Sequence, residues 1–376
     1  MNVLFMLPSL RLAGAERQTV DLVNALANKE GYNVHLFTFE RDLDLIDVLD
    51  QTKVKLYNHP RRHKFDFSNI RRIAEIIDRE KIDIVHCTLQ IALLFGFLGV
   101  RRSQRKPKLI NAIHTTINRN MKADLFDRLL YVPIMRRCER VITVCDSQKA
   151  HWLKKYPFLA EKLVTVHNGI DTAYFTDDLG DEAKDKLRKE LSIKDGELII
   201  GMVAGFRPEK NHEEVFIAFS RLVRQNLPVK LLLIGDGAKR QFLMSKAQEL
   251  GIGNRVILVG FTNEAKKYIS IIDVGVLFSY AVETFSMAIL EMLAMGKPVV
   301  AADIGGTKEM IKDGITGCLV QRRDVDALTD KLTLLLRNDQ LRKEYGIAAR
   351  RTIKNNFTTD LMAEKTERVF EKIYKG

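Results

Sequence analysis

The stretch VGVLFSYAVETFSMAILEMLAMGKPVVA, residues 274–301, decides the fold. The apolar run at 274–278 has the length of a buried strand, and residues 286–295 carry apolar side chains at helical spacing. A second short apolar run, 298–301, follows a glycine and a proline that end the helix. A strand, a helix and a strand in succession form the repeating unit of a parallel sheet whose faces are covered by helices. The stretch therefore predicts an α/β domain.

The same alternation extends over most of the chain. Expected strands cover 3–7, 33–39, 82–87, 109–113, 141–144, 163–166, 198–203, 230–234, 256–259, 274–278 and 298–301. Expected helices cover 16–28, 69–80, 89–98, a segment from 147 on, 212–224, 239–250, 286–295 and 325–336. A length of 376 residues suits two such domains.

The expected linker is the highly charged stretch 172–197, which is poor in apolar side chains. We therefore expect an N-terminal domain over 1–175 and a second domain over 176–357. A final helix within 358–376 is long enough to cross back to the first domain.

Composition limits the function classes. The apolar fraction of 46% gives each domain enough side chains for a core. The four cysteines form no Cys-x-x-Cys pair and are typical of reduced thiols in a cytoplasmic protein. The longest apolar run, 91–100, is about half of the ~20 residues that a membrane-spanning helix needs. The apolar run after Met1 predicts a strand and not a signal peptide.

The net charge of +12 is concentrated in residues 1–175, which hold 28 Lys and Arg against 19 Asp and Glu. A cationic half favours an anionic partner: phosphate groups, an acidic membrane surface or nucleic acid. An ordinary solvated basic surface is the alternative. Basic strings stand at 61–64, 71–72 and 101–106, but few aromatic side chains lie near them for base stacking. We therefore expect no nucleic acid partner and favour an anionic membrane or a diphosphate-linked lipid.

Two carboxylates in the opening stretch are spaced for a ligand. Glu283 and Glu291 lie eight residues apart, and with a helix expected from Thr284 on they stand roughly 12 Å apart along its axis. The free backbone N–H groups at Thr284, Phe285 and Ser286 would bind an anion, and carboxylates accept hydrogen bonds from vicinal hydroxyls. The pattern suits a nucleotide-diphosphate sugar. Two exposed acids on an ordinary helix are the alternative.

With its flanks, this segment resembles the C-terminal domain of the retaining glycosyltransferases of family 4. The resemblance implies the GT-B fold, in which two Rossmann-like domains face each other across a cleft. It also implies that Glu283 contacts the donor hexose and Glu291 the ribose hydroxyls. Thr284 stands where a Gly is commoner in the family, but its backbone N–H remains.

Two further turns after expected strands resemble the donor site of that family. In GFRPEKNH, residues 205–212, Arg207 presents a bidentate fork and Lys210 a compact charge. Without a metal, these two cations would have to stabilise the leaving phosphate. Gly235 and Asp236 resemble the loop beside the nucleotide. A charged strand–helix turn without a ligand is the alternative.

The first half carries the expected acceptor side. The loop at 12–17 resembles the Gly-Gly-x-Glu loop of the family, with Ala13 in place of the first Gly. The resemblance places Gly14 near the donor and Glu16 and Arg17 on the acceptor side.

Two histidines end neighbouring strands of the expected first sheet, where ligands bind in open α/β folds. His114 stands where family members often carry a His near the reaction centre. His86 has no such counterpart, and we interpret it as structural.

Two Asp-x-Asp strings, 42–44 and 324–326, could suggest a metal, but the second stands at a helix start, where Asp is a common cap. We expect no metal and no other cofactor. The resemblance thus implies a retaining hexosyltransferase with His114, Glu283, Arg207 and Lys210 as catalytic residues. It would move a hexose or N-acetylhexosamine from a nucleotide-diphosphate sugar, UDP-linked by family frequency, to a lipid-linked glycan at the inner face of the cell membrane. A nucleotide-sugar epimerase and a non-catalytic nucleotide-sugar-binding protein are the alternatives.

Overall fold

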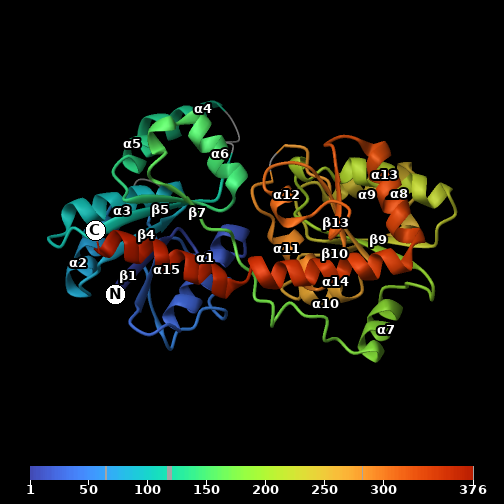
Figure 1. The fold of residues 1–376 in the computed structure, drawn as a ribbon, viewed down its shortest axis with the longest axis horizontal. Coiled ribbons are helices and arrows are strands. Elements are labelled where there is room, and N and C mark those ends of the chain that lie inside the picture. The colour runs from blue at the N-terminus through green and yellow to red at the C-terminus, as the bar shows by residue number, and fades with distance from the viewer. Residues whose placement is uncertain (64–65, 117–120, 282, 376) are drawn as a thin grey trace. The chain divides into compact units, whose positions relative to one another are not determined.

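The computed structural model describes residues 1–63, 66–116, 121–281 and 283–375. It divides into two compact units, each an α/β structure (Figure 1). The first unit consists of Met1–Gly169 with Thr359–Gly376, and the second of Ile170–Thr358. The four cysteines are free and buried. In the described part of the chain, no helix has both the length and the apolar character that crossing a bilayer requires.

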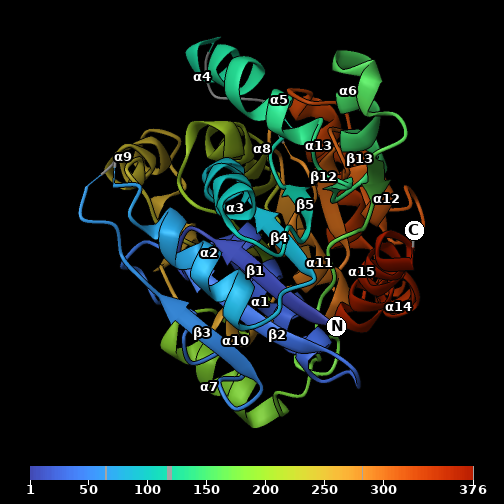
Figure 2. The same cartoon turned by 90° about the vertical axis from the view of Figure 1, so that its left-hand side faces the viewer.

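The first unit is built on a seven-stranded parallel sheet in the order β3-β2-β1-β4-β5-β6-β7. Figure 2 shows β3, β2, β1, β4 and β5 side by side in this sheet. Its strands are β1 (Asn2–Leu7), β2 (Asn33–Thr38), β3 (Val54–Asn58), β4 (Ile84–Thr88), β5 (Lys108–Ile113), β6 (Arg140–Thr143) and β7 (Leu163–Thr165). The central β1 pairs through Val3 with Val34 on one side and with Ile84 on the other. Its residues 3–7 are fully buried, as the unbroken apolar run predicts for a strand covered on both faces.

Helices cover both faces of this sheet. They are α1 (Gly14–Ala27), α2 (Asn69–Arg79), α3 (Gln90–Arg102), α4 (Met121–Phe126), the π-helical turn η1 (Asp127–Tyr131), α5 (Val132–Met135), α6 (Asp146–Lys155) and α15 (Thr359–Lys375). One core joins the sheet to α2, α3, α5 and α6, and the other joins it to α1 and α15. Phe370 of α15 packs against Phe5 of β1, with ring centroids 6.3 Å apart. The chain's last helix is therefore part of the first unit.

The second unit repeats the architecture with a six-stranded parallel sheet in the order β10-β9-β8-β11-β12-β13. Its strands are β8 (Leu198–Val203), β9 (Val229–Ile234), β10 (Val256–Gly260), β11 (Val274–Leu277), β12 (Val299–Ala302) and β13 (Gly317–Val320). Its helices are α7 (Asp181–Glu190), η3 (Pro208–Lys210), α8 (His212–Arg224), α9 (Arg240–Glu249), α10 (Ala265–Ser270), α11 (Met287–Ala294), α12 (Thr307–Met310), α13 (Val325–Arg337) and α14 (Asp339–Asn356).

The structure differs from the sequence expectation around the junction of the units. The division falls at Gly169, six residues before the expected boundary, because the Ile170 N–H donates to the Phe357 carbonyl at 2.9 Å and so joins the second unit. Helix α7 occupies part of the stretch that we expected to be the linker. Only Leu187 is buried on this helix, so its charged sequence carries almost no apolar periodicity.

Candidate active site

The second unit gathers its polar loops at the carboxyl edge of the sheet. β9 and β10 lie on one side of β8, and β11, β12 and β13 on the other, so the strand order reverses direction between β8 and β11. Open parallel sheets bind ligands outside the carboxyl ends of strands at such a reversal. The loops after β8 and β11 carry Arg207, Lys210 and Glu283, which are the sequence candidates for donor binding.

The loop after β8 presents two cations through a short helical turn, η3. It is closed by Asn211, whose backbone is left-handed with φ 57°, and whose side-chain amide donates to the Phe278 carbonyl at 3.2 Å. This hydrogen bond ties the loop to the end of β11. Arg207 is half exposed, and its Nε lies 3.3 Å from Glu209 Oε1. The Arg207 guanidinium therefore remains open to solvent on one side while a neighbouring carboxylate holds it.

A largely buried ion pair in the site joins Lys210 to Glu283. Lys210 Nζ lies 2.7 Å from Glu283 Oε2, and both side chains are largely buried, at 13% and 8% exposure. Ser279 Oγ donates to the same Oε2 atom at 2.8 Å. A lysine and an acid 73 residues apart in sequence thus meet at the strand reversal.

The segment between the two acids is not helical from Thr284, contrary to the sequence expectation. Helix α11 begins at Met287, and Ser286 is its N-cap, with its hydroxyl accepting from Ile289 N–H at 3.4 Å. The carbonyls of Glu283 and Thr284 instead accept from Gly306 N–H at 3.2 and 3.0 Å, which holds the segment against the loop after β12. Glu291 consequently lies one turn inside α11 and not two.

Two glycines are required by close backbone approaches at this edge. Gly305 has φ +55°, and a Cβ there would lie 1.8 Å from the Glu283 carbonyl oxygen. Gly235 has φ +140°, and a Cβ there would lie 2.2 Å from the Ala204 carbonyl oxygen. Asp236, the next residue, accepts from Arg240 at 3.1 Å. Gly235 and Asp236 therefore lie at the end of β9, beside the loop that carries Arg207.

Sequence reasoning missed three side chains of this edge: Ser279, Glu209 and His212. Ser279 and Glu209 contact candidates directly, and a serine at a strand end four residues before an acid was the available signal. His212 is buried with its ring edge-on to Phe206, at 5.1 Å between centroids. Burial lowers the pKa of His212 to about 4, so the side chain is neutral near pH 7.

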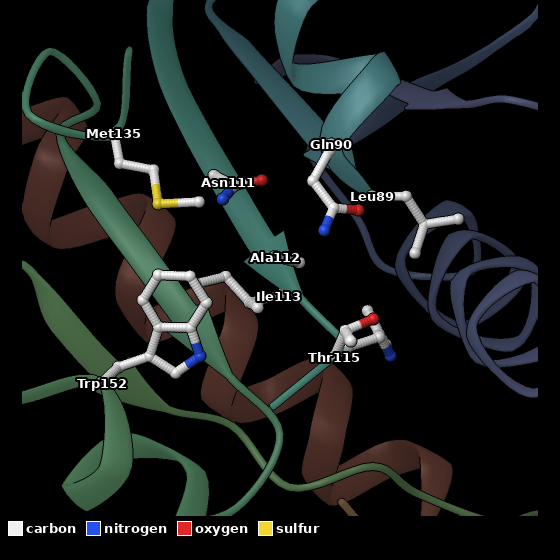
Figure 3. Close-up of a pocket in the computed structure, with 9 residues that line it drawn as sticks. Leu89, Gln90, Asn111, Ala112, Ile113, Thr115, Met135 and Trp152 are labelled. Carbon is white, nitrogen blue, oxygen red and sulfur yellow. The ribbon is translucent and has the colours of Figure 1, made fainter. Parts of the chain in front are cut away.

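In the first unit, the end of β5 leads to His114, which lines two pockets. One pocket surrounds the strand end, with Met135 and Trp152 on one side and Gln90 on the other (Figure 3). Burial lowers the pKa of His114 to about 4. The imidazole is therefore a neutral hydrogen-bonding group near pH 7, and not a cation.

The second pocket joins His114 to His86 and reaches Thr366 on α15. His86 is 2% exposed, and its Nδ1 has no hydrogen-bond partner among the described residues. Burial, followed by the charge of His114, lowers the pKa of His86 to about 3. The two histidines thus share one pocket, which sequence reasoning did not anticipate because it set His86 aside as structural.

In the loop at the start of α1, two of the three candidate residues from the sequence are paired with neighbouring side chains. Gly14 is the first residue of α1 and is exposed. Glu16 is 3% exposed and accepts from Arg11 Nε at 3.1 Å. Arg17 donates to Asp21, one turn along α1, at 3.0 Å. Glu16 and Arg17 are thus both held by neighbouring side chains.

The basic strings of the first half are partly engaged within the fold. Arg61 pairs with Glu40, and only 15% of its side chain is exposed. Arg105 donates to a backbone carbonyl and to an aspartate. Lys64, which completes the first string, and the neighbouring Phe65 lie outside the described residues. The sequence charge therefore overstates the free cationic surface.

Two family models match the chain. The model of the glycosyl transferases group 1 matches residues 183–352, and the model of Glycosyltransferase Family 4 matches residues 12–174. Each covers most of one structural unit. The predicted resemblance to these families is confirmed.

Curated relatives and solved structures match over nearly the whole chain. N-acetyl-alpha-D-glucosaminyl L-malate synthase of Bacillus anthracis is 25% identical, over 91% of this chain and 90% of its own. UDP-Gal:alpha-D-GlcNAc-diphosphoundecaprenol alpha-1,3-galactosyltransferase of Escherichia coli is 23% identical, over 96% and 94%. Anabaena Alr3699/HepE in complex with UDP-glucose is 20% identical, covers 99% of this chain and 100% of its own, and has a TM-score of 0.86. This likeness confirms the predicted fold class, α/β with two Rossmann-like units of the GT-B type.

Proposed function

The chain belongs to the glycosyl transferases group 1 and Glycosyltransferase Family 4, and from this membership we propose that it moves a hexose or N-acetylhexosamine from a UDP-linked donor to an acceptor hydroxyl. It is a glycosyltransferase that uses a nucleotide sugar. The identity of the base, retention at the anomeric carbon and independence of metal belong to the proposal.

The ion pair between Lys210 and Glu283 carries the proposal. The pair lies at the strand reversal, where open parallel sheets bind ligands. An anionic ligand bound there can replace Glu283 as the partner of Lys210 and Glu209 as the partner of Arg207. We assign Arg207 and Lys210 to the donor diphosphate, because a guanidinium fork and an ammonium group are the side chains that bind phosphate oxygens. We assign Glu283 to the hexose hydroxyls and Glu291 to the ribose.

The backbone around the start of α11 completes the proposed donor site. Thr284, Phe285 and Ser286 precede the helix, and their N–H groups lie near its positive end. Gly235 and Asp236 would lie beside the nucleotide. Because the family is retaining, we propose that the leaving phosphate, stabilised by the two cations, accepts the proton of the incoming acceptor hydroxyl on the same face of the sugar.

We assign the acceptor side to the first unit. His114 is neutral near pH 7 and can therefore act as either donor or acceptor of a hydrogen bond with a sugar hydroxyl. Gly14 offers an exposed backbone at the start of α1, and Glu16 and Arg17 are proposed to shape this loop through their contacts with Arg11 and Asp21.

We propose a lipid-linked glycan as the acceptor, and contact with an anionic membrane at the inner face of the cell membrane. The name of the Escherichia coli relative includes a diphosphoundecaprenol acceptor. In this chain, the segment of α4 and η1 exposes Leu125, Phe126 and Leu129 by 55%, 56% and 69%. Arg128 is exposed within the same segment. Apolar side chains beside a cation are typical of a surface that binds anionic lipid.

A binding and turnover screen tests the donor assignment. Thermal shift against UDP-, GDP- and ADP-sugars should single out the UDP series, and a lipid-diphosphate glycan should then receive the sugar. Interconversion of the donor sugar without an acceptor would establish an epimerase. Binding without any release of nucleotide would establish a binding protein.

Co-sedimentation with vesicles tests the membrane assignment. Phosphatidylglycerol vesicles should retain the wild-type protein, and Leu129→Ser should reduce retention. Equal binding to phosphatidylcholine vesicles, or an unchanged variant, would refute the assignment of this segment.

A further inference from the structure

Glu283 receives both of its hydrogen bonds on one oxygen. Lys210 Nζ and Ser279 Oγ lie 2.7 and 2.8 Å from Oε2. Among the residues that the structure describes, no donor lies within hydrogen-bond reach of Oε1. The carboxylate is thus held at one oxygen and offers the other as an acceptor.

The two donors differ in how firmly the fold holds them. Ser279 is 1% exposed and follows Phe278, whose carbonyl is itself bound by the Asn211 side chain at 3.2 Å. The Lys210 ammonium stands at the end of a long, flexible side chain, and Lys210 belongs to the turn that we assign to binding the diphosphate. When a phosphate draws the Lys210 ammonium away, the Ser279 hydroxyl is the donor that stays.

We propose that Ser279 is a positioning residue that keeps Glu283 Oε1 directed at the donor sugar while Lys210 binds the diphosphate. This inference rests on the proposed function of the same site. Without the Ser279 hydroxyl, the Glu283 carboxylate would lose the donor that fixes its direction once Lys210 binds the diphosphate. A hydroxyl donating to a carboxylate is a charge-assisted hydrogen bond, about twice as strong as one between neutral groups.

Ser279→Ala separates positioning from general support of the loop. Calorimetric titration with UDP and with UDP-glucose measures the gain in affinity that the sugar provides. For Ser279→Ala, we expect the gain to fall about ten-fold, the typical effect of losing a hydrogen bond to a charged group. The affinity for UDP itself should stay within about two-fold, because the Ser279 hydroxyl donates to Glu283 and not to a group that we assign to the diphosphate. Ser220→Ala, which removes another buried hydroxyl from the same unit, is the matched control.

A double-mutant cycle tests whether Ser279 acts through Glu283. In a Glu283→Gln background, Ser279→Ala should cause no further loss of the sugar-dependent gain, because the group that it positions is already altered. Ser279→Cys, which keeps the volume and a weak donor, should restore part of the gain and guards against a misfolded alanine variant.

The outcomes separate this inference from the function on which it rests. A wild-type protein that binds neither UDP nor UDP-glucose would overturn the proposed donor. A wild-type protein that binds both equally well, an equal loss of both ligands in Ser279→Ala, or additive losses in the double variant would overturn only the positioning role.

Discussion

The carboxyl edges of the two sheets carry opposite kinds of polar group. In the first unit, His86 and His114 share a pocket, and burial lowers the pKa of each well below neutrality. In the second unit, the corresponding edge carries the ion pair of Lys210 with Glu283 and the contact of Arg207 with Glu209. One fold topology therefore supports a neutral edge and a charged edge.

The two edges suit different ligand groups. A neutral imidazole offers one donor and one acceptor, which suits an uncharged hydroxyl. A cation already paired with a carboxylate can take a phosphate as its new partner, so the cation itself stays paired, and unpaired buried charges are costly. The proposed division into an acceptor side and a donor side thus has a physical basis within each unit.

The largest expected effect is on the charged edge. Arg207→Ala should lower kcat/KM for sugar transfer by about 10²–10³, the usual cost of removing one group that stabilises transition-state charge. The melting temperature should stay unchanged, because the Arg207 side chain is 52% exposed and its partner Glu209 is accessible to water. Arg224→Ala, at an exposed arginine of the same unit, is the control. Near-normal sugar transfer by Arg207→Ala would refute the assignment of the Arg207 guanidinium to the donor diphosphate.

A second prediction concerns the backbone that supports the charged edge. Gly305→Ala should destabilise the second unit severely and abolish donor binding, since the new Cβ would lie 1.8 Å from the Glu283 carbonyl oxygen. Gly314→Ala is the matched control: it has a similar φ, +71°, but its nearest neighbour, the Tyr345 hydroxyl, is 3.8 Å away. The control should cost only about 1 kcal/mol, the strain of an alanine at positive φ. Denaturant unfolding of the two variants measures the difference, and equal losses would contradict it.

The two edges also differ in how much of their structure could be predicted from the sequence. The charged edge was predictable because Arg207, Lys210 and Glu283 stand in short loops directly after apolar strands, and parallel strands bring such loops to one edge. The start of α11 was placed three residues too early because Thr284 and Phe285 fit a helix locally. In the structure, the carbonyls of Glu283 and Thr284 accept instead from the Gly306 N–H in the loop after β12, a contact between distant parts of the chain that no local pattern reveals.

The neutral edge was harder to predict, because its chemistry depends on burial. The sequence predicts that both His86 and His114 end strands, but in the structure His114 follows β5 while His86 lies inside β4, and the packing of α15 over the sheet closes their shared pocket. Likewise, the burial of Glu16 against Arg11 depends on the conformation of the loop before α1. Charge and spacing can be read from a sequence, whereas the dielectric surroundings of a side chain cannot.

A third prediction uses pH to probe the neutral edge. The pKa of His86 is about 3 in the folded protein, below its usual value, so the unfolded chain takes up the proton first as pH falls. The stability that depends on a neutral His86 is therefore complete above about pH 6.5 and is lost progressively toward pH 3. His86→Phe, beside Phe5 and Phe370, removes this titration.

Thermal melts of the wild type and His86→Phe at pH 7 and pH 4.5 measure this effect. The variant should lose less stability on acidification, by about 2–3 kcal/mol at pH 4.5 for a single histidine kept neutral. His212 lies in the other unit and remains in both proteins, so its contribution cancels. Parallel pH curves for the two proteins would show that His86 does not titrate in this way.

The smallest expected effect is that of removing metal ions. Arg207 and Lys210 already provide two positive charges at the proposed diphosphate site, so transfer should continue in excess EDTA at its original rate. The two Asp-x-Asp segments that could suggest a metal site each make hydrogen bonds within the fold. Asp324 accepts from Ala327 N–H at 2.9 Å as the N-cap of α13, and Asp44 accepts from Leu12 N–H at 3.1 Å. Full loss of transfer on chelation, restored by Mg²⁺ or Mn²⁺, would mean that the charge on the leaving phosphate is not carried by side chains alone. In that event, the contrast between a neutral and a charged edge would no longer account for catalysis, although it would still describe the fold.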